Sequence, residues 1–197
     1  MLDDYIKKAE RVLENKFGIK PERSRLVYHE DWTSFIKENG LSLYSESVFL
    51  PKDLTAHLPN DRLEKVLPLV FHELEGHGSY CEHNLQGKKL VEDEKIFSQL
   101  KGEEKLKFAY ECSAYFQKIK PYFEGFAVWM EEFLLKGVGR EDLWLERREK
   151  SKRMPLDAHH SYFDAYSILK EFEKEKGTYE LWNTIGFHVN KALGGTK

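Results

Sequence analysis

Residues 72–77 read HELEGH, which places His72 and His77 five positions apart with Glu73 directly after the first histidine. Imidazole nitrogens bind zinc, and a nearby carboxylate can take a proton from an attacking water molecule. On a regular α-helix, residues five apart differ by roughly 140° and cannot share one metal ion. A π-bulge would absorb the extra residue, and Gly76 would permit it. We therefore predict a bulged helix, with His72 and His77 as metal ligands and Glu73 as general base.

A third ligand is expected from a later helix. The segment EGFAVWME (124–131) places Glu124 before two small residues, Gly125 and Ala127, which would let this helix approach the metal helix closely. Glu131 lies two turns further along the same face, where it could accept a hydrogen bond from a ligand histidine. The spacing does not give the Glu-x-x-His pairs of a di-metal bundle. One metal ion, held by His72, His77 and Glu124, is the prediction.

Two segments resemble known zinc peptidases. HELEGH resembles the H-E-x-x-G-H signature of dipeptidyl peptidase III and the H-E-x-x-x-H signature of the tubulin tyrosine carboxypeptidase family. EGFAVWME resembles the glutamate helix, E-G-x-A-x-[YW]-x-E, of the carboxypeptidase family and of related bacterial metallopeptidases. The resemblance covers roughly residues 60–135. It implies the gluzincin class, with a Zn²⁺ ion on His72, His77 and Glu124. Val128 departs from thermolysin-type gluzincins, which have an acidic residue at that place.

A cluster near the C-terminus offers groups that could stabilise an oxyanion. The segment DAHHSYFDAYSILKEF (157–172) contains His159, His160 and Tyr162 at the expected start of a helix. Zinc peptidases commonly place a tyrosine or histidine opposite the metal. The aromatic residues of this segment also fit an ordinary core stripe at helical spacing. Both interpretations stay open.

The rest of the chain predicts a mostly α (α+β) fold. We expect one domain over residues 1–197, with a zincin-like fold, a small N-terminal β-sheet and a helical C-terminal part. Pro121 is expected in the first turn of its helix, and Asp61 is expected to cap the metal helix. Apolar periodicity and breakers predict helices at 2–17, 31–40, 62–83, 88–100, 103–118, 121–136, 141–152, 159–175 and 178–192, and strands at 24–30 and within 41–51.

Composition narrows the class of protein. The formal charge of −3 lacks the basic excess of a nucleic-acid-binding protein. The first residues do not form a signal peptide, and no apolar run reaches transmembrane length, so we expect a cytoplasmic protein without a membrane partner. The charged fraction of 33%, rich in Lys and Glu, favours a thermophilic source. Cys81 and Cys112 would then be either reduced or paired. The run ERREKSKR (146–153) is predicted to be a solvated helix face.

These features together predict a zinc metallopeptidase that hydrolyses peptide bonds of a peptide or protein substrate. Residues 45–51 could form an edge strand that pairs with an extended peptide, or an ordinary sheet strand. Two other functions stay open. One is a non-catalytic zinc-binding scaffold or interaction protein, which would not need Glu73, and the other is a zinc hydrolase of a non-peptide amide. The sequence leaves the substrate, the exo- or endopeptidase preference and the oligomeric state undecided.

Overall fold

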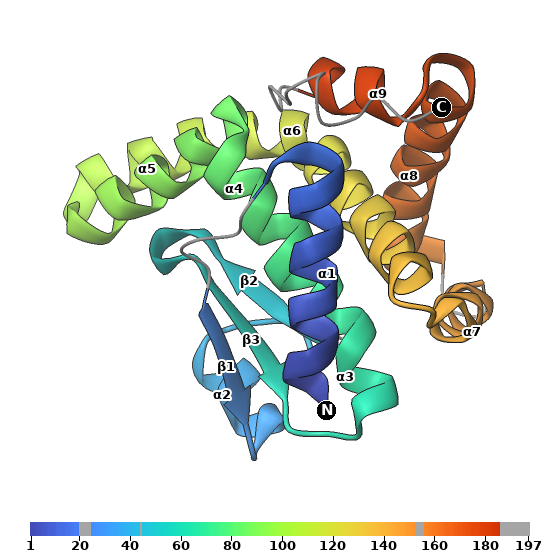
Figure 1. Cartoon of the computed structure of the whole chain (residues 1–197). Coiled ribbons are helices and arrows are strands. Elements are labelled where there is room, and N and C mark those ends of the chain that lie inside the picture. The colour runs from blue at the N-terminus through green and yellow to red at the C-terminus, as the bar shows by residue number, and fades with distance from the viewer. Residues whose placement is uncertain (20–24, 44, 153–155, 186–197) are drawn as a thin grey trace.

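The computed structural model describes residues 1–19, 25–43, 45–152 and 156–185, and for residues 156–162 it describes the backbone alone (Figure 1). Helices dominate this part of the chain, and a small sheet lies in its N-terminal third. None of the described helices combines the length and the apolar character needed to cross a bilayer. The helices are α1 (Leu2–Phe17), α2 (Trp32–Glu38), α3 (Leu63–Val70), α4 (Ser79–His83), α5 (Leu85–Gln99), α6 (Gly102–Gly137), α7 (Glu141–Ser151), α8 (Leu156–Lys176) and α9 (Thr178–Thr184), with a 3₁₀ turn η1 (Pro51–Asp53) and a π-helix η2 (Phe71–Gly78).

The sheet is built from β1 (Arg25–His29), β2 (Val48–Leu50) and β3 (Thr55–Pro59), in the order β1-β3-β2. β3 runs parallel to β1 and antiparallel to β2. The sequence did not predict β3. Its segment TAHLP is short, ends in a proline and does not alternate between apolar and polar residues. Its central position is instead set by burial of Thr55, Ala56 and Leu58. The strand predicted within 41–51 is reduced to β2, at an edge of the sheet.

α1 closes one side of the helical core. Ala9, Leu13 and Phe17 recur every four residues and form the buried face of the helix. Gly18 ends the helix in a left-handed conformation, with φ of 69°, as expected for a glycine C-cap. Phe17 stacks on Trp182 of α9 with ring centroids 3.9 Å apart. This contact joins the two ends of the described chain.

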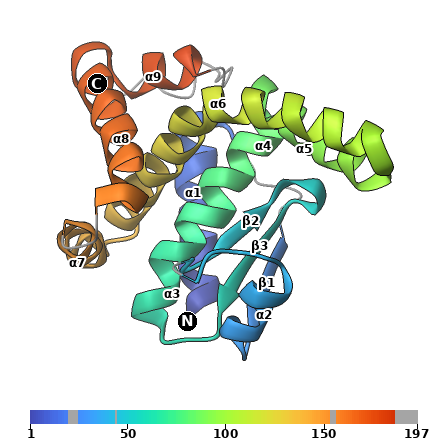
Figure 2. The ribbon, with the colours of Figure 1, turned by 180° about the vertical axis from the view of Figure 1, so that it is seen from behind.

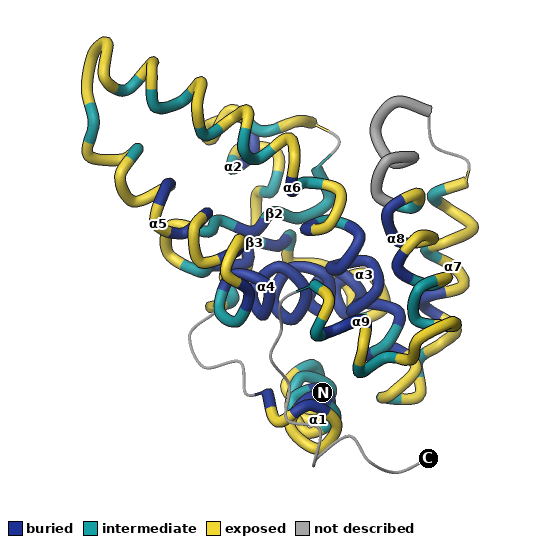
Figure 3. The backbone as a smooth tube through the Cα atoms, turned by 90° about the horizontal axis from the view of Figure 1, so that it is seen from above, coloured by how far each residue is buried: buried dark blue, intermediate teal, exposed yellow. Residues whose placement is uncertain are grey.

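The prediction of two helices separated at Pro121 is wrong. α6 is one helix of 36 residues, and Pro121 lies inside it. A proline removes one backbone hydrogen bond, but its fixed φ is helical, so packing of the following residues can carry the helix through. Residues 123–135 are largely buried, whereas none of residues 102–118 is. The exposed part of α6 projects from the body beside α5, and we call this pair, residues 85–118, the arm (Figures 1 and 3).

One unbroken helical segment, α3–η2–α4, carries the histidines. It begins at Leu63 and continues through Pro68, which lies inside α3. Asp61 does not cap it, because Arg62 is the residue that precedes the helix and no side chain caps it. β2 and β3 contact η2 from one side and α6 contacts it from another, as the view from behind shows (Figure 2). The histidine segment is therefore held between the sheet and α6.

Candidate metal centre

The predicted departure from an α-helix is present at the two histidines. η2 is a π-helix of eight residues, longer than the one-residue bulge that the spacing required. The change in winding brings the two imidazoles to the same side, with the ring centroids of His72 and His77 4.9 Å apart. All eight residues of η2 are buried. The late second histidine therefore does not separate the pair.

Gly76 serves this geometry by its small size. It is absent from the glycines with positive φ among the described residues, so the backbone there does not demand a glycine. A Cβ atom at Gly76 would instead lie 2.7 Å from the Cα atom of Ala127. Gly125, which the sequence assigned to the same contact, faces Ala165 of α8 instead. The close approach of η2 and α6 thus rests on Gly76 and Ala127.

We expect Gly76→Ala to push η2 away from α6 and to weaken metal binding, because Glu124 lies one turn before Ala127. Overpacking of this kind typically lowers the free energy of unfolding by about 1–3 kcal/mol. Thermal unfolding and zinc titration would measure the two effects. Gly137→Ala is the matched control, since its Cβ would meet only the Val12 side chain at 3.4 Å. Equal zinc affinity in Gly76→Ala and the parent would show that the close approach does not set the site.

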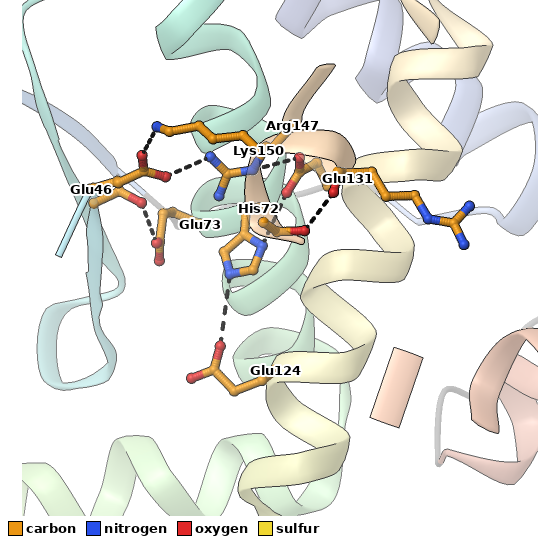
Figure 4. A network of polar contacts seen from close by, with 10 residues as sticks. Glu46, His72, Glu73, Glu124, Glu131, Arg147 and Lys150 are labelled. Carbon is orange, nitrogen blue, oxygen red and sulfur yellow. Dashed lines mark hydrogen bonds and ion pairs between the residues drawn. The ribbon is translucent and has the colours of Figure 1, made fainter. Parts of the chain in front are cut away.

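The structure brings the three predicted ligands together (Figure 4). Glu124 Oε2 lies 3.3 Å from His77 Nε2 and 3.7 Å from His72 Nε2. One ligand atom from each of the three residues lies within 4.8 Å of the other two. A tetrahedral zinc ion with bonds of about 2.1 Å has ligand atoms roughly 3.4 Å apart. The donor set and its spacing could therefore hold a metal ion, and two of the distances are close to those of a zinc site. Glu124 comes from the middle of α6 and not, as predicted, from the first turn of a helix.

Neighbouring side chains orient the two imidazoles. Glu131 Oε2 lies 3.3 Å from His72 Nδ1, so the opposite ring nitrogen of His72 is directed toward Glu124. The ring of His77 stacks on Phe123, with centroids 4.0 Å apart. Its Nδ1 is buried and has no hydrogen-bond partner among the described residues. In both rings Nε2 is the nitrogen that faces the third ligand.

Glu73 lies beside the ligands with one oxygen held. Ser47 donates its hydroxyl hydrogen to Glu73 Oε1 at 2.6 Å. The other oxygen, Oε2, lies 4.0 Å from Nε2 of His77. The side chain is only 7% exposed. Glu73 therefore presents one carboxylate oxygen toward the ligand triangle, where a base could act.

The electrostatics of the cluster favour positive charge. Burial works against a charged His72, but the carboxylates of Glu124 and Glu131 outweigh it and raise the pKa of His72 to about 10. Burial alone would raise the pKa of Glu124, yet His77 and His72 hold it well below its usual range. A proton on His72 or a divalent cation would meet the same need, because buried carboxylates require a compensating charge.

Other predicted or possible site residues contribute differently. Cys81 is buried, and burial raises the pKa of its thiol. Cys81 and Cys112 are both free. Within the described ranges, only His72, His77 and Glu124 form a metal-ligating group. The side chains of His159, His160 and Tyr162 lie outside the described residues, so their part in the site stays a prediction.

Sequence reasoning missed Ser47, Glu46 and Arg147. Arg147 belongs to the charge run that was predicted to be solvated, yet only 25% of its side chain is exposed. The helical periodicity of α7 could have indicated that Arg147 faces inward. Leu143 and Trp144 are buried, and residues three and four positions later share their face. No comparable signal marked Ser47, which precedes β2 in an irregular segment.

A cleft of about 810 Å³ contains the cluster. β2 forms one wall, and all three of its residues line the cleft. The arm contributes apolar residues, among them Leu90, Phe97 and Phe116, and the carboxylates of Asp93 and Glu94. Arg147 and Lys150 of α7 form a basic wall. The candidate metal centre is thus reachable by a ligand much larger than water.

Comparison of the chain with protein-family models, with curated proteins and with solved structures gave no match. The chemistry of the site therefore has to be argued from its own residues.

Proposed function

We propose that this protein is a zinc-dependent peptidase, with one zinc ion held by His72, His77 and Glu124. One observation carries the proposal: the three ligand atoms converge beside the buried carboxylate of Glu73. Ser47 holds one oxygen of this carboxylate, Oε1, by a hydrogen bond. A non-catalytic zinc scaffold needs the three ligands but does not need the carboxylate of Glu73. The proposal includes the gluzincin class, in which one helix supplies two histidines and a later one a glutamate, and with it a zincin-like fold.

The chemistry follows from the placement of Glu73. Zinc, when bound, acidifies water and polarises a carbonyl group. Glu73 accepts the proton of the attacking water and then delivers it to the leaving amine, so that one residue serves as base and acid. Ser47 limits rotation of the carboxylate and keeps Glu73 Oε2 directed toward the ligands.

The cleft supports a peptide as substrate. β2 has β3 on one side, and no other described strand pairs with its outer edge. An extended peptide can pair with such an edge through its backbone, while pockets select its side chains. Leu90, Phe97 and Phe116 line the cleft on the arm. We therefore expect one large apolar side chain of the substrate to bind next to the scissile bond.

The test is digestion of a peptide library by the purified, zinc-loaded protein, with the cleavage sites read by mass spectrometry. We expect cleavage that a chelator abolishes and added zinc restores, with apolar residues enriched beside the cut. Glu73→Gln protein, purified in the same way, controls for contaminating peptidases. Zinc binding without any peptide cleavage would favour the scaffold. Cleavage of small amides but not of peptides would favour the third class of function.

A further inference from the structure

Arg147 of α7 connects two parts of the centre that are far apart in the sequence (Figure 4). Its Nε lies 2.8 Å from Glu131 Oε1, and its NH1 donates to Glu46 Oε2 at 3.0 Å. We propose that Arg147 is a positioning residue that sets both the ligand His72 and the base Glu73. This inference rests on the proposed function for its catalytic half, whereas its metal-binding half can be measured without any substrate.

The first branch leads through Glu131 to the metal ligand. One oxygen of Glu131 pairs with Arg147 and the other lies 3.3 Å from His72 Nδ1. The Glu131 side chain is 1% exposed, so water cannot replace a lost partner. Without Arg147 the buried carboxylate would keep no permanent cation beside it among the described residues and would change its position. The orientation of His72 would then be lost with it.

The second branch leads through Glu46 to the base. Arg147 holds one oxygen of Glu46, and Lys150 pairs with the other. The next residue, Ser47, donates to Glu73. Residues 45–47 belong to no helix or strand, so their position depends on such contacts. Clamping Glu46 to α7 therefore fixes the hydroxyl that holds Glu73 in place.

An arginine suits this position because it reaches two carboxylates at once. Its planar group directs Nε and NH1 along fixed directions, whereas a lysine offers one charged nitrogen. Arg147→Lys should therefore keep the charge and lose one of the two branches. That expectation separates positioning from a simple requirement for positive charge near the cleft.

The experiment compares Arg147→Met and Arg147→Lys with the parent. Arg148→Met is the matched control, since Arg148 is the neighbouring residue on α7 and is exposed. Zinc affinity is measured by competition with a chelator, and the ligand geometry by the absorption spectrum of the cobalt-substituted protein. We expect Arg147→Met to lower zinc affinity by about 10–100-fold, as for other residues that orient a metal ligand. Arg147→Lys should fall between Arg147→Met and the parent, and Arg148→Met should match the parent.

The catalytic half is measured at saturating zinc on a peptide identified by the library digest. A displaced base lowers kcat more than it changes KM, and misplacement of about 1 Å can cost roughly 100-fold. Glu46→Ala removes both oxygens that Arg147 and Lys150 hold, and so breaks the second branch alone, at a site where 33% of the side chain is exposed. It should lower kcat while zinc affinity and the cobalt spectrum stay those of the parent.

The outcomes separate this inference from the proposed function. If Arg147→Met keeps the zinc affinity and cobalt spectrum of the parent, the inference fails whatever the activity. If Arg147→Met does not fold, Glu46→Ala decides, and an unchanged kcat overturns the second branch. If the parent binds zinc but cleaves no peptide, the proposed function fails, and the zinc affinities still test whether Arg147 orients His72.

Discussion

Glu73→Gln is expected to abolish most peptide hydrolysis while the protein keeps its zinc and its fold. The glutamine has the shape of glutamate, and its carbonyl oxygen can still accept the hydrogen bond from Ser47. Its amide cannot take a proton, however, and a general base typically contributes about 10²–10⁴-fold to turnover. The measurement is kcat on a confirmed peptide, with zinc content and melting temperature determined on the same preparation.

Glu94→Gln provides the matched control for Glu73→Gln. Glu94 is an exposed carboxylate that lines the same cleft on α5, so its replacement removes a similar charge. We expect its turnover to match that of the parent. Glu73→Gln would disprove the mechanism if it cleaved the peptide as fast as Glu94→Gln does. A loss of zinc in Glu73→Gln would instead assign Glu73 to metal binding.

Replacing any one of the three ligands by alanine should empty the site. His72→Ala, His77→Ala and Glu124→Ala each leave two protein ligands, whereas zinc sites in catalytic centres keep three. The loss of affinity should exceed the roughly 100-fold cost of disturbing a residue that only orients a ligand. Zinc per chain after dialysis, determined by elemental analysis, measures the effect, and hydrolysis should disappear in parallel.

The control for the ligand variants is a histidine outside the cluster. His29 lies on β1 and shares a hydrogen bond of 2.8 Å with His57 of β3. His29→Ala should retain the zinc of the parent protein. If the three ligand variants retain as much zinc as His29→Ala does, the ion is bound elsewhere and the proposed centre is wrong.

The local part of the site could be predicted from the sequence because it depends on helical spacing. His72 and His77 are five residues apart, and only a change in winding brings such residues to one side of a helix. That change is a property of one segment, and η2 shows it. Glu124 is different, since its place beside the histidines depends on packing of α6 against η2. The motif around Glu124 suggested a third metal ligand, but a sequence motif does not show how far Glu124 lies from the two histidines.

The parts that escaped prediction depend on contacts between distant segments. β3 is a strand because it lies between β1 and β2, and its own five residues carry little strand pattern. α6 continues through Pro121 because the residues after it are buried. Arg147 looked like one charge among many, since composition does not show which charges face inward. In each case the structure is decided by packing and ion pairs with segments that are distant in the sequence, which a local sequence pattern does not contain.

Pro121 gives the long helix α6 a mechanical consequence. Because proline has no amide hydrogen, the carbonyl oxygen of Gln117 lacks its usual donor, and α6 bends most easily there. Glu124 lies on the buried side of that point, and the arm lies on the exposed side. We therefore expect a bulky side chain in the cleft to displace residues before Pro121, such as Phe116, more easily than Glu124. One helix would then combine a fixed metal ligand after Pro121 with an adaptable stretch of the cleft wall before it.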